Sequence, residues 1–188
     1  MRIGVLALQG DFREHAELLE TLGVEAVKVR KESDLEGVAG LVIPGGESTA
    51  ISKLIVNFGL LEPLRSFVSK KPVLATCAGL ILLSNEVEGK LEDQELIGGL
   101  DIKTSRNAYG SQLDSFEANV QYEDTAEHVA FIRAPKILDS SRVKVLARLG
   151  DEVVAVQQGN LFAACYHPEI TGAKHLHSLF ITQIQNQK

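Results

Sequence analysis

The chain has 188 residues, 45% of them hydrophobic, with 19 Lys and Arg against 25 Asp and Glu and a formal net charge of -6. A chain of this length can bury one sizeable core, so we expect a single domain over residues 1–188. The acidic balance and the lack of a basic run argue against an electrostatic surface for nucleic acid or an anionic membrane. Small molecules and other proteins are the expected partners.

The apolar runs are too short for a membrane span, which needs about 18 residues. The first run, residues 3–8, ends at Gln9-Gly10-Asp11 and lacks the length and cleavage pattern of a signal peptide, so we interpret it as a buried strand. Two cysteines, Cys77 and Cys165, do not make a disulfide scaffold. We therefore expect a cytoplasmic protein in which Cys77 stays reduced.

Apolar runs alternate with helical patterns along the first half. The runs cover residues 3–8, 26–29, 41–43 and 73–76, apolar residues recur at helical spacing between 12 and 22, and a further helix is expected from about Thr49. Strands separated by helices predict parallel βαβ units. Continuous Val, Ile and Leu runs are typical of parallel strands buried on both faces.

The second half has a different pattern. Extended runs cover residues 142–149, 153–157 and 161–166, and Gln158-Gly159-Asn160 joins the last two in a way typical of a tight hairpin. Residues 173–185 are expected to form a closing helix, and residues 85–114 surface loops with a small β excursion. The sequence thus predicts a three-layer α/β fold, an open, mixed, mostly parallel sheet flanked by helices, with an antiparallel part in the second half.

Cys77 lies at a break between two apolar runs, residues 73–76 and 80–83. This order is typical of a strand, a sharp turn and a helix, an elbow that presents a nucleophile at the end of a buried strand. The N–H groups that open the helix could stabilise an anion there. A lone cysteine after an apolar strand is usually a small core residue, but the elbow context favours a catalytic role. Cys165 is the competing thiol, but its position within an apolar run favours a buried structural role.

The segment Tyr166-His167-Pro168-Glu169 supplies a base and a carboxylate far downstream. On an extended strand His167 and Glu169 share a face, so the carboxylate can fix the imidazole tautomer. With Cys77 they indicate a Cys-His-Glu triad, the alternative being a surface His/Glu pair. His175 and His177 resemble a metal pair, but they lack a third ligand at useful spacing, so we expect them on a solvated surface and predict no metal site.

Several candidate residues follow predicted strands. In an open α/β sheet ligands bind at the carboxyl ends of the strands. Here these ends are Gln9-Gly10, residues 44–49, Cys77 and residues 167–169, and we expect them to meet at one rim. Gly45 and Gly46 could form only a turn, yet adjacent glycines also allow close backbone approach to a ligand. A helix beginning at residues 48–49 would add its positive dipole end.

Together these segments resemble the class I glutamine amidotransferases, and most closely the PdxT/SNO family of glutaminase subunits of pyridoxal 5′-phosphate synthase. The resemblance covers nearly the whole chain. The Cys77 and His167-Pro168-Glu169 motifs are typical of the broad class. The segments that indicate the narrower family are residues 4–10, Pro-Gly-Gly-Glu-Ser-Thr at 44–49, Arg106-Asn107 with Gly110, and Phe-Ile-Arg-Ala-Pro at 131–135. The chain departs from the family pattern at Ala75, Ser111, Tyr166 and Ile170, and Ser111 could alter contacts to a partner or substrate.

The resemblance implies a flavodoxin-like amidotransferase fold and hydrolysis of L-glutamine to L-glutamate and ammonia. Cys77 would attack the side-chain amide, His167 would act as base and acid, and Glu169 would hold the imidazole ring. Backbone N–H groups of Gly46 and Ala78 would hold the oxyanion. The residues implied to bind glutamine are Gly46, Glu47, Ser48, Arg106, Ile132 and Arg133, the charged ones reading its α-amino and α-carboxylate groups. Arg133 could instead lie along the sheet edge.

The resemblance also implies a protein partner and no cofactor. Members of the family deliver ammonia to a separate barrel synthase subunit in a large multi-copy assembly, and we expect this chain to dock such a subunit near Gln9 and Gly10. Docking would complete the oxyanion site, so the isolated chain would have weak activity.

Three alternative functions remain open. The glutaminase of histidine biosynthesis is disfavoured by Arg106-Asn107 and by residues 131–133. A protease or deglycase of the related superfamily often has histidine directly after the nucleophile, where this chain has Ala78. A non-catalytic interaction subunit is the third.

Overall fold

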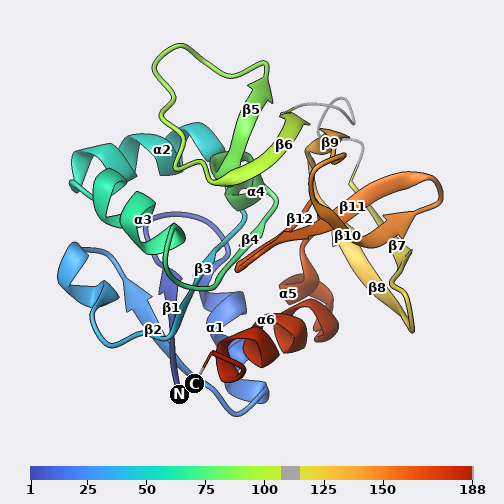
Figure 1. The fold of residues 1–188 in the computed structure, drawn as a ribbon, viewed down its shortest axis with the longest axis horizontal. Helices are drawn as coiled ribbons and strands as arrows, with labels where there is room; N and C mark the ends of the chain where they lie inside the picture. The colour runs from blue at the N-terminus through green and yellow to red at the C-terminus, as the bar shows by residue number, and fades with distance from the viewer. Residues whose placement is uncertain (107–114, 188) are drawn as a thin grey trace.

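The computed structural model describes residues 1–106 and 115–187. Within these residues the chain forms a nine-stranded mixed sheet and a separate three-stranded sheet. Helices cover both faces of the large sheet (Figure 1). This arrangement confirms the predicted α/β fold of a mixed sheet flanked by helices.

Five neighbouring strands of the large sheet run parallel. Their order is β2 (Glu25–Val29), β1 (Arg2–Leu6), β3 (Gly40–Ile43), β4 (Val73–Thr76) and β12 (Leu161–Ala164). The strands predicted in the first half are confirmed to within two residues. Every residue of β3, β4 and β12 is buried, which is why these strands read as continuous apolar runs.

The helices lie on two faces because the chain reverses direction along the sheet. Figure 1 shows α1 (Phe12–Thr21), α5 (Pro168–Thr171) and α6 (His175–Gln185) on one side, and α2 (Ser48–Asn57) and α3 (Leu61–Val68) on the other. The β1-to-β2 and β3-to-β4 connections move in opposite directions, so right-handed crossovers put their helices on opposite faces. The remaining helices of the described residues are the short η1 (Glu32–Leu35) and α4 (Ala78–Leu83).

The other side of the large sheet is antiparallel, as the second half of the sequence predicts. It contains β11 (Glu152–Gln158), β10 (Lys144–Leu149), β7 (Phe116–Gln121) and β8 (Ala126–Phe131). Gln158 pairs with Leu161 in the predicted β11–β12 hairpin. The β7–β8 hairpin was not predicted, because most residues of β7 are exposed and its pattern carries little apolar signal.

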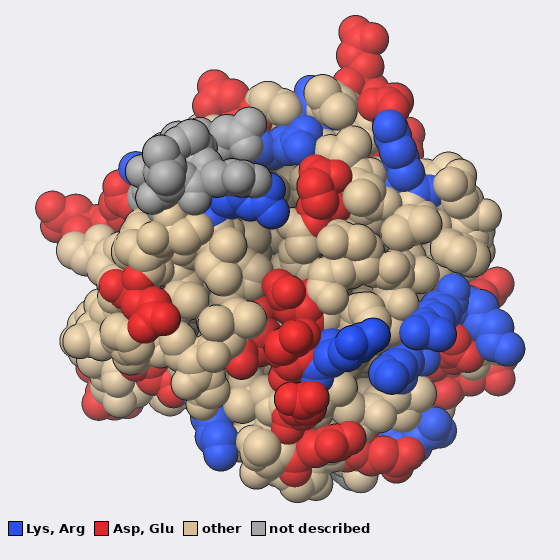
Figure 2. All heavy atoms as spheres, turned by 180° about the vertical axis from the view of Figure 1, so that it is seen from behind, with Lys and Arg blue, Asp and Glu red and all other residues tan. Residues whose placement is uncertain are grey.

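The stretch predicted as loops with a β excursion forms part of the small sheet. There β5 (Ser84–Glu88) pairs with β6 (Leu100–Ser105), and β9 (Lys136–Asp139) joins from further along the chain. None of the helices in the described parts of the chain has the length and apolar character that crossing a membrane would require. Figure 2 shows acidic and basic side chains interspersed over one face of the molecule.

Candidate active site

A pocket of about 290 Å³ opens where β1, β3, β4 and β12 end. The four segments expected at one rim do meet there. Its walls contain Gly46, Glu47, Ser48, Cys77, Ala78, Arg106, Ile132, Arg133 and His167 from the predicted set, with Gln9, Gly10, Asp11 and Ile81. The pocket lies beside β1 and β3, the neighbouring strands at which the chain reverses direction, where open α/β sheets bind ligands.

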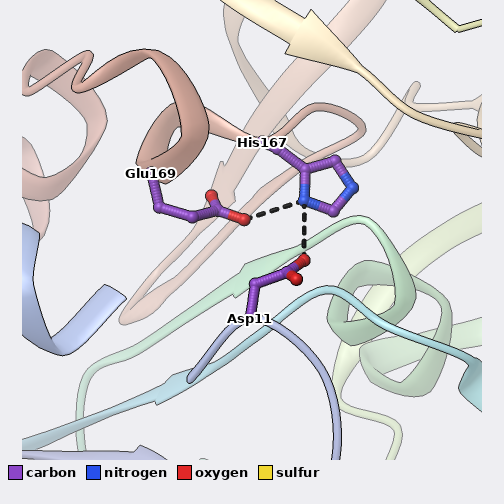
Figure 3. A group of neighbouring side chains, drawn as sticks. All are labelled: Asp11, His167 and Glu169. Carbon is purple, nitrogen blue, oxygen red and sulfur yellow. Dashed lines mark hydrogen bonds and ion pairs between the residues drawn. The ribbon is translucent and has the colours of Figure 1, made fainter. Parts of the chain in front are cut away.

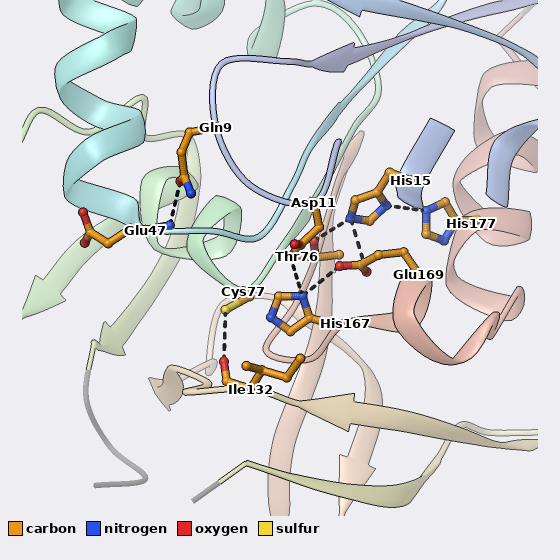
Figure 4. Close-up of polar contacts among 10 residues, drawn as sticks. All are labelled: Gln9, Asp11, His15, Glu47, Thr76, Cys77, Ile132, His167, Glu169 and His177. Carbon is orange, nitrogen blue, oxygen red and sulfur yellow. Dashed lines mark hydrogen bonds and ion pairs between the residues drawn. The ribbon is translucent and has the colours of Figure 1, made fainter. Parts of the chain in front are cut away.

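Cys77 forms the predicted elbow between β4 and α4. Its backbone has φ 47° and ψ -105°, an unfavourable conformation for a residue with a Cβ. The Cys77 N–H donates to the Ala164 carbonyl at 2.9 Å, and its thiol lies 3.9 Å from the Ile132 carbonyl oxygen. The turn therefore holds the thiol at the pocket wall, facing the His167 ring (Figure 4).

His167 and Glu169 are in contact, but not in the predicted way. The expectation that they share a strand face is wrong, because β12 ends at Ala164 and Pro168 begins α5. The helical turn carries the Glu169 carboxylate back to His167, where Oε1 lies 2.7 Å from Nδ1 (Figure 3). The His167 N–H in turn donates to the Ala130 carbonyl of β8 at 2.8 Å, which anchors the backbone before the turn.

A second carboxylate, which the sequence analysis did not identify, faces the same nitrogen. Asp11 Oδ2 lies 3.2 Å from His167 Nδ1. Because the Glu169 and Asp11 carboxylates both face Nδ1, that nitrogen carries a proton. The other ring nitrogen, Nε2, lies on the side of Cys77 (Figure 4). The only signal for Asp11 was its position directly after the Gln9-Gly10 segment at the end of the first strand.

Burial and neighbouring charges act in opposite directions on the His167–Glu169 pair. Burial disfavours a charged His167 ring, but Asp11, Cys77 and Glu169 outweigh it and raise the His167 pKa well above its usual value. Burial raises the pKa of Glu169, and the hydrogen bond from His167 offsets that shift only in part. The site therefore favours an imidazolium ring beside the thiol.

Cys165 is a poor alternative nucleophile. It is 1% exposed and belongs to the hydrophobic core, as its position in the sequence indicated. Burial, and then the nearby Cys77, raise the pKa of the Cys165 thiol far above its usual value. A thiol held in its protonated form is unreactive.

Glu47 and Arg106 form a charged pair in the pocket wall. The Glu47 side chain caps α2 by accepting hydrogen bonds from the Thr49 and Ala50 N–H groups at 3.1 and 2.7 Å. Arg106 Nη2 lies 3.3 Å from Glu47 Oε1 and donates to Thr49 Oγ1 at 2.9 Å. Burial alone would raise the Glu47 pKa, but these hydrogen bonds and Arg106 lower it. The rest of the Arg106 segment, with Asn107 and Ser111, lies outside the described residues.

The two glycines after β3 allow close approach of other residues of the site. A Cβ at Gly45 would lie 2.3 Å from His167 Cε1. At Gly46, with φ 148°, a Cβ would lie 2.5 Å from Gln9 Oε1, which accepts a hydrogen bond from the Glu47 N–H at 2.8 Å. A side chain at either position would push the candidate base or Gln9 out of place.

Two buried histidines form a layer behind the candidate triad. The expectation that His177 lies on a solvated surface is wrong, since it is fully buried and contacts His15. His175 is half-buried, with its ring 4.4 Å from that of Tyr122. The buried face of α6 carries His177 among Leu176, Phe180 and Ile181, a helical spacing that could have indicated burial.

One group among the described residues has ligand atoms close enough for a metal ion. These atoms belong to Asp11, His167 and Glu169 and lie within 4.8 Å of one another. Both carboxylates lie within hydrogen-bond or ion-pair distance of Nδ1, so a proton on that nitrogen accounts for the arrangement.

Comparisons with known proteins agree on the family. The SNO glutamine amidotransferase family matches residues 5–186. Proteins named pyridoxal 5′-phosphate synthase subunit PdxT are similar over nearly their full length. The one from Moorella thermoacetica is 48% identical, with 98% of this chain and 100% of that protein covered. The one from Corynebacterium diphtheriae is 50% identical, with the same coverage.

A crystal structure described as a glutamine amidotransferase has the same fold. It superposes with a TM-score of 0.91 at 44% identity, covering 97% of this chain and 98% of the other. This likeness confirms the amidotransferase fold that the sequence motifs implied. The chain belongs to the SNO glutamine amidotransferase family.

Proposed function

We propose that this chain is the glutaminase subunit of a pyridoxal 5′-phosphate synthase, with Cys77, His167 and Glu169 as its catalytic residues. The names and coverage of its relatives support the activity. The observation that carries the residue assignment is the 2.7 Å contact between His167 Nδ1 and Glu169 Oε1 beside a cysteine held at a strained elbow. A nucleophile, a base and an orienting carboxylate in this order are what covalent amide hydrolysis requires.

The reaction follows from these positions. The Cys77 thiolate attacks the side-chain amide carbon of glutamine, and the imidazolium of His167 gives its Nε2 proton to the departing ammonia. A thioester remains on Cys77. His167, now neutral, takes a proton from water, which attacks the thioester and releases glutamate. Glu169 holds the ring and stabilises its charged form in both steps.

Backbone N–H groups are the proposed oxyanion donors. Ala78 is the first residue of α4, so its N–H has no acceptor within that helix. Gly46 lines the same pocket as Ala78. One such donor contributes about 3 kcal/mol to transition-state stabilisation in comparable sites.

The charged pair in the pocket wall supports the choice of glutamine as substrate. Glu47 and Arg106 present one negative and one positive group, which suits the α-amino and α-carboxylate groups of an amino acid. The proposed binding set also includes Ser48, Ile132 and Arg133, which line the same pocket. The position of Arg133 in the pocket wall supports a binding role over the alternative in which it only lies along the sheet edge.

Released ammonia is useful only if a partner consumes it. We propose that a barrel synthase subunit docks over the rim around Gln9 and Gly10, where Ile132 is 36% exposed, and that several copies of the pair assemble together. Docking would also seal the pocket from water and complete the oxyanion site. Because the nucleophile must stay reduced, we expect a cytoplasmic location.

Glutamate release from glutamine tests the proposal. The wild-type chain, Cys77→Ala and Cys165→Ala are each assayed with and without the barrel subunit. We expect activity that rises when the barrel is added, disappears in Cys77→Ala and persists in Cys165→Ala. Activity that survives in Cys77→Ala would refute the nucleophile, and a wild-type chain without activity in either mixture would favour a non-catalytic role.

A further inference from the structure

A polar cluster that the proposed chemistry does not use lies behind Glu169. It consists of His15 on α1, Thr76 at the end of β4 and His177 on α6, and all three side chains are fully buried. His15 Nδ1 lies 3.0 Å from His177 Nε2, and His15 Nε2 lies 2.9 Å from Thr76 Oγ1 (Figure 4). His15 therefore connects two helices to the strand that leads into Cys77.

His15 Nε2 also faces the candidate triad. Glu169 Oε2 lies 3.3 Å from His15 Nε2, while Oε1 faces His167. Oε2 is fully buried and has no hydrogen-bond donor of good geometry in the described part of the chain. A buried carboxylate oxygen left alone is costly, so the N–H of His15 is the group that can satisfy it, shared with Thr76 Oγ1.

Only one arrangement of protons satisfies these contacts. If His15 carried its proton on Nδ1, its Nε2 lone pair would face the Glu169 carboxylate and repel it. His177 would then also bury an unpaired Nδ1–H, since no partner for that atom is present among the described residues. With the proton on Nε2, His177 Nε2–H donates to His15 Nδ1 and His15 donates toward Thr76 and Glu169. Burial lowers the pKa of both His15 and His177, and this direction agrees with neutral rings in this arrangement.

We propose that His15 is a positioning residue for the triad, whose Nε2–H holds Oε2 of Glu169 so that Oε1 is aimed at His167, while His177 fixes the His15 tautomer. The inference rests on the proposed function, because it assigns His15 a role in that reaction. It differs from a structural role in what it predicts for substitutions. Replacing a purely structural histidine lowers stability alone. Replacing a positioning histidine lowers kcat, and only a side chain that restores an N–H donor at the Nε2 position recovers it.

Substitutions that keep or remove this donor test the proposal in the complex with the barrel subunit. His15→Leu removes the N–H at similar volume, and we expect kcat to fall about 10- to 100-fold with KM within threefold of the wild type. His15→Gln places an amide N–H near the Nε2 position, and we expect kcat within about fivefold of the wild type. His177→Leu, which leaves the His15 tautomer unfixed, should give an intermediate loss. His128→Leu is the matched control, because His128 is exposed and its ring bonds to Glu117 and Asn119, away from the candidate triad.

The outcomes separate this inference from the proposed function. No glutamine hydrolysis by the wild-type complex would refute the proposed function itself. An active wild type with His15→Leu within twofold in kcat, or with His15→Gln as impaired as His15→Leu, would overturn the positioning role alone. If His15→Leu does not fold, His15→Asn replaces it, since its amide reaches only the Nδ1 position. We then expect kcat of His15→Asn at least tenfold below that of His15→Gln, and equal values would overturn the inference.

Discussion

Gly45→Ala is the smallest change that should displace the proposed base. Gly45 does not have a positive φ, so alanine fits its backbone and the effect comes from the added methyl group alone. That Cβ would lie 2.3 Å from His167 Cε1, 2.9 Å from Nδ1 and 3.1 Å from Asp11 Oδ2. The methyl group therefore points at the ring that is proposed to activate Cys77.

The size of the effect follows from the overlap. Ordinary van der Waals contact begins at 3.4 Å, so the distance of 2.3 Å requires the ring to move by their difference, 1.1 Å. A movement of that size breaks the 2.7 Å contact with Glu169 Oε1. Misplacing a catalytic group by about 1 Å costs about 100-fold in rate, and overpacking of this kind costs about 1–3 kcal/mol in the free energy of unfolding.

Steady-state glutaminase kinetics in the presence of the barrel subunit, with thermal unfolding in parallel, measure both effects. Gly23→Ala serves as the control, because an added Cβ there would meet no atom within 4 Å, although Gly23 has φ 75°. Gly23 follows α1 at the end remote from the pocket. It should lower stability by about 1 kcal/mol and leave kcat unchanged. The reasoning fails if Gly45→Ala keeps a wild-type kcat, or if Gly23→Ala loses as much activity.

Three further predictions concern other parts of the site. Cys165→Ala should keep glutaminase activity within twofold. It should lower the melting temperature by a few degrees, as expected for about 1 kcal/mol lost from the core. A large loss of kcat would contradict the structural role of Cys165. Arg106→Lys keeps the charge but loses the planar fork in which Nη2 contacts Glu47 and Thr49 and Nη1 donates to Gln94 Oε1, so KM for glutamine should rise about tenfold, with less effect on kcat. An unchanged KM in initial-rate assays would remove Arg106 from the binding set. Burial lowers the His177 pKa to about 3, so its contribution to stability is complete above about pH 6.5 and is lost as the pH falls. Urea unfolding at pH 6.5 and 4.5 should show a loss about 2 kcal/mol larger in the wild type than in His177→Leu, and equal losses would contradict a neutral buried ring.

The sequence was most informative where one local cause decides the structure. The strands at the centre of the sheet are buried on both faces, so their continuous apolar runs predicted the ends of β3 and β4 to within one residue. The elbow at Cys77 was predictable because small residues interrupt an apolar run at the point where the strand ends. The rule that parallel strands end at the same rim predicted the pocket segments at Gln9-Gly10, Cys77 and residues 44–49 and 167–169. Arg106, Ile132 and Arg133 were predicted from the family resemblance alone, because they follow β6 and β8, which lie outside the parallel part of the sheet.

The errors concern structure that depends on contacts distant in the sequence. The sequence through residues 161–166 reads as one strand, but the backbone of His167 bonds to Ala130 and Pro168 then begins a helix. That turn, and not strand alternation, brings Glu169 to His167. The apolar face of α6 could have indicated that His177 is buried, but its partner His15 lies 162 positions earlier in the chain, and no local pattern contains that contact.

Backbone strain in the described residues gathers at the proposed site. Cys77 and Arg133 are the non-glycine residues there with positive φ, at 47° and 46°, and both line the pocket. Each such conformation costs about 1–2 kcal/mol. The cost at Cys77 is met by backbone hydrogen bonds on both sides, from its own N–H to Ala164 and from the Ile81 N–H to its carbonyl.

The two strained turns also contact each other. The Cys77 thiol lies 3.9 Å from the carbonyl oxygen of Ile132, the residue before Arg133. The position of the nucleophile is therefore set jointly by the end of β4 and the turn that follows β8, elements more than fifty residues apart in the sequence. Strain of this kind persists only where the surrounding structure enforces it, and it is concentrated at functional sites. The conformation of the backbone thus supports the same location for the chemistry as the side chains do, and it does so independently of any motif.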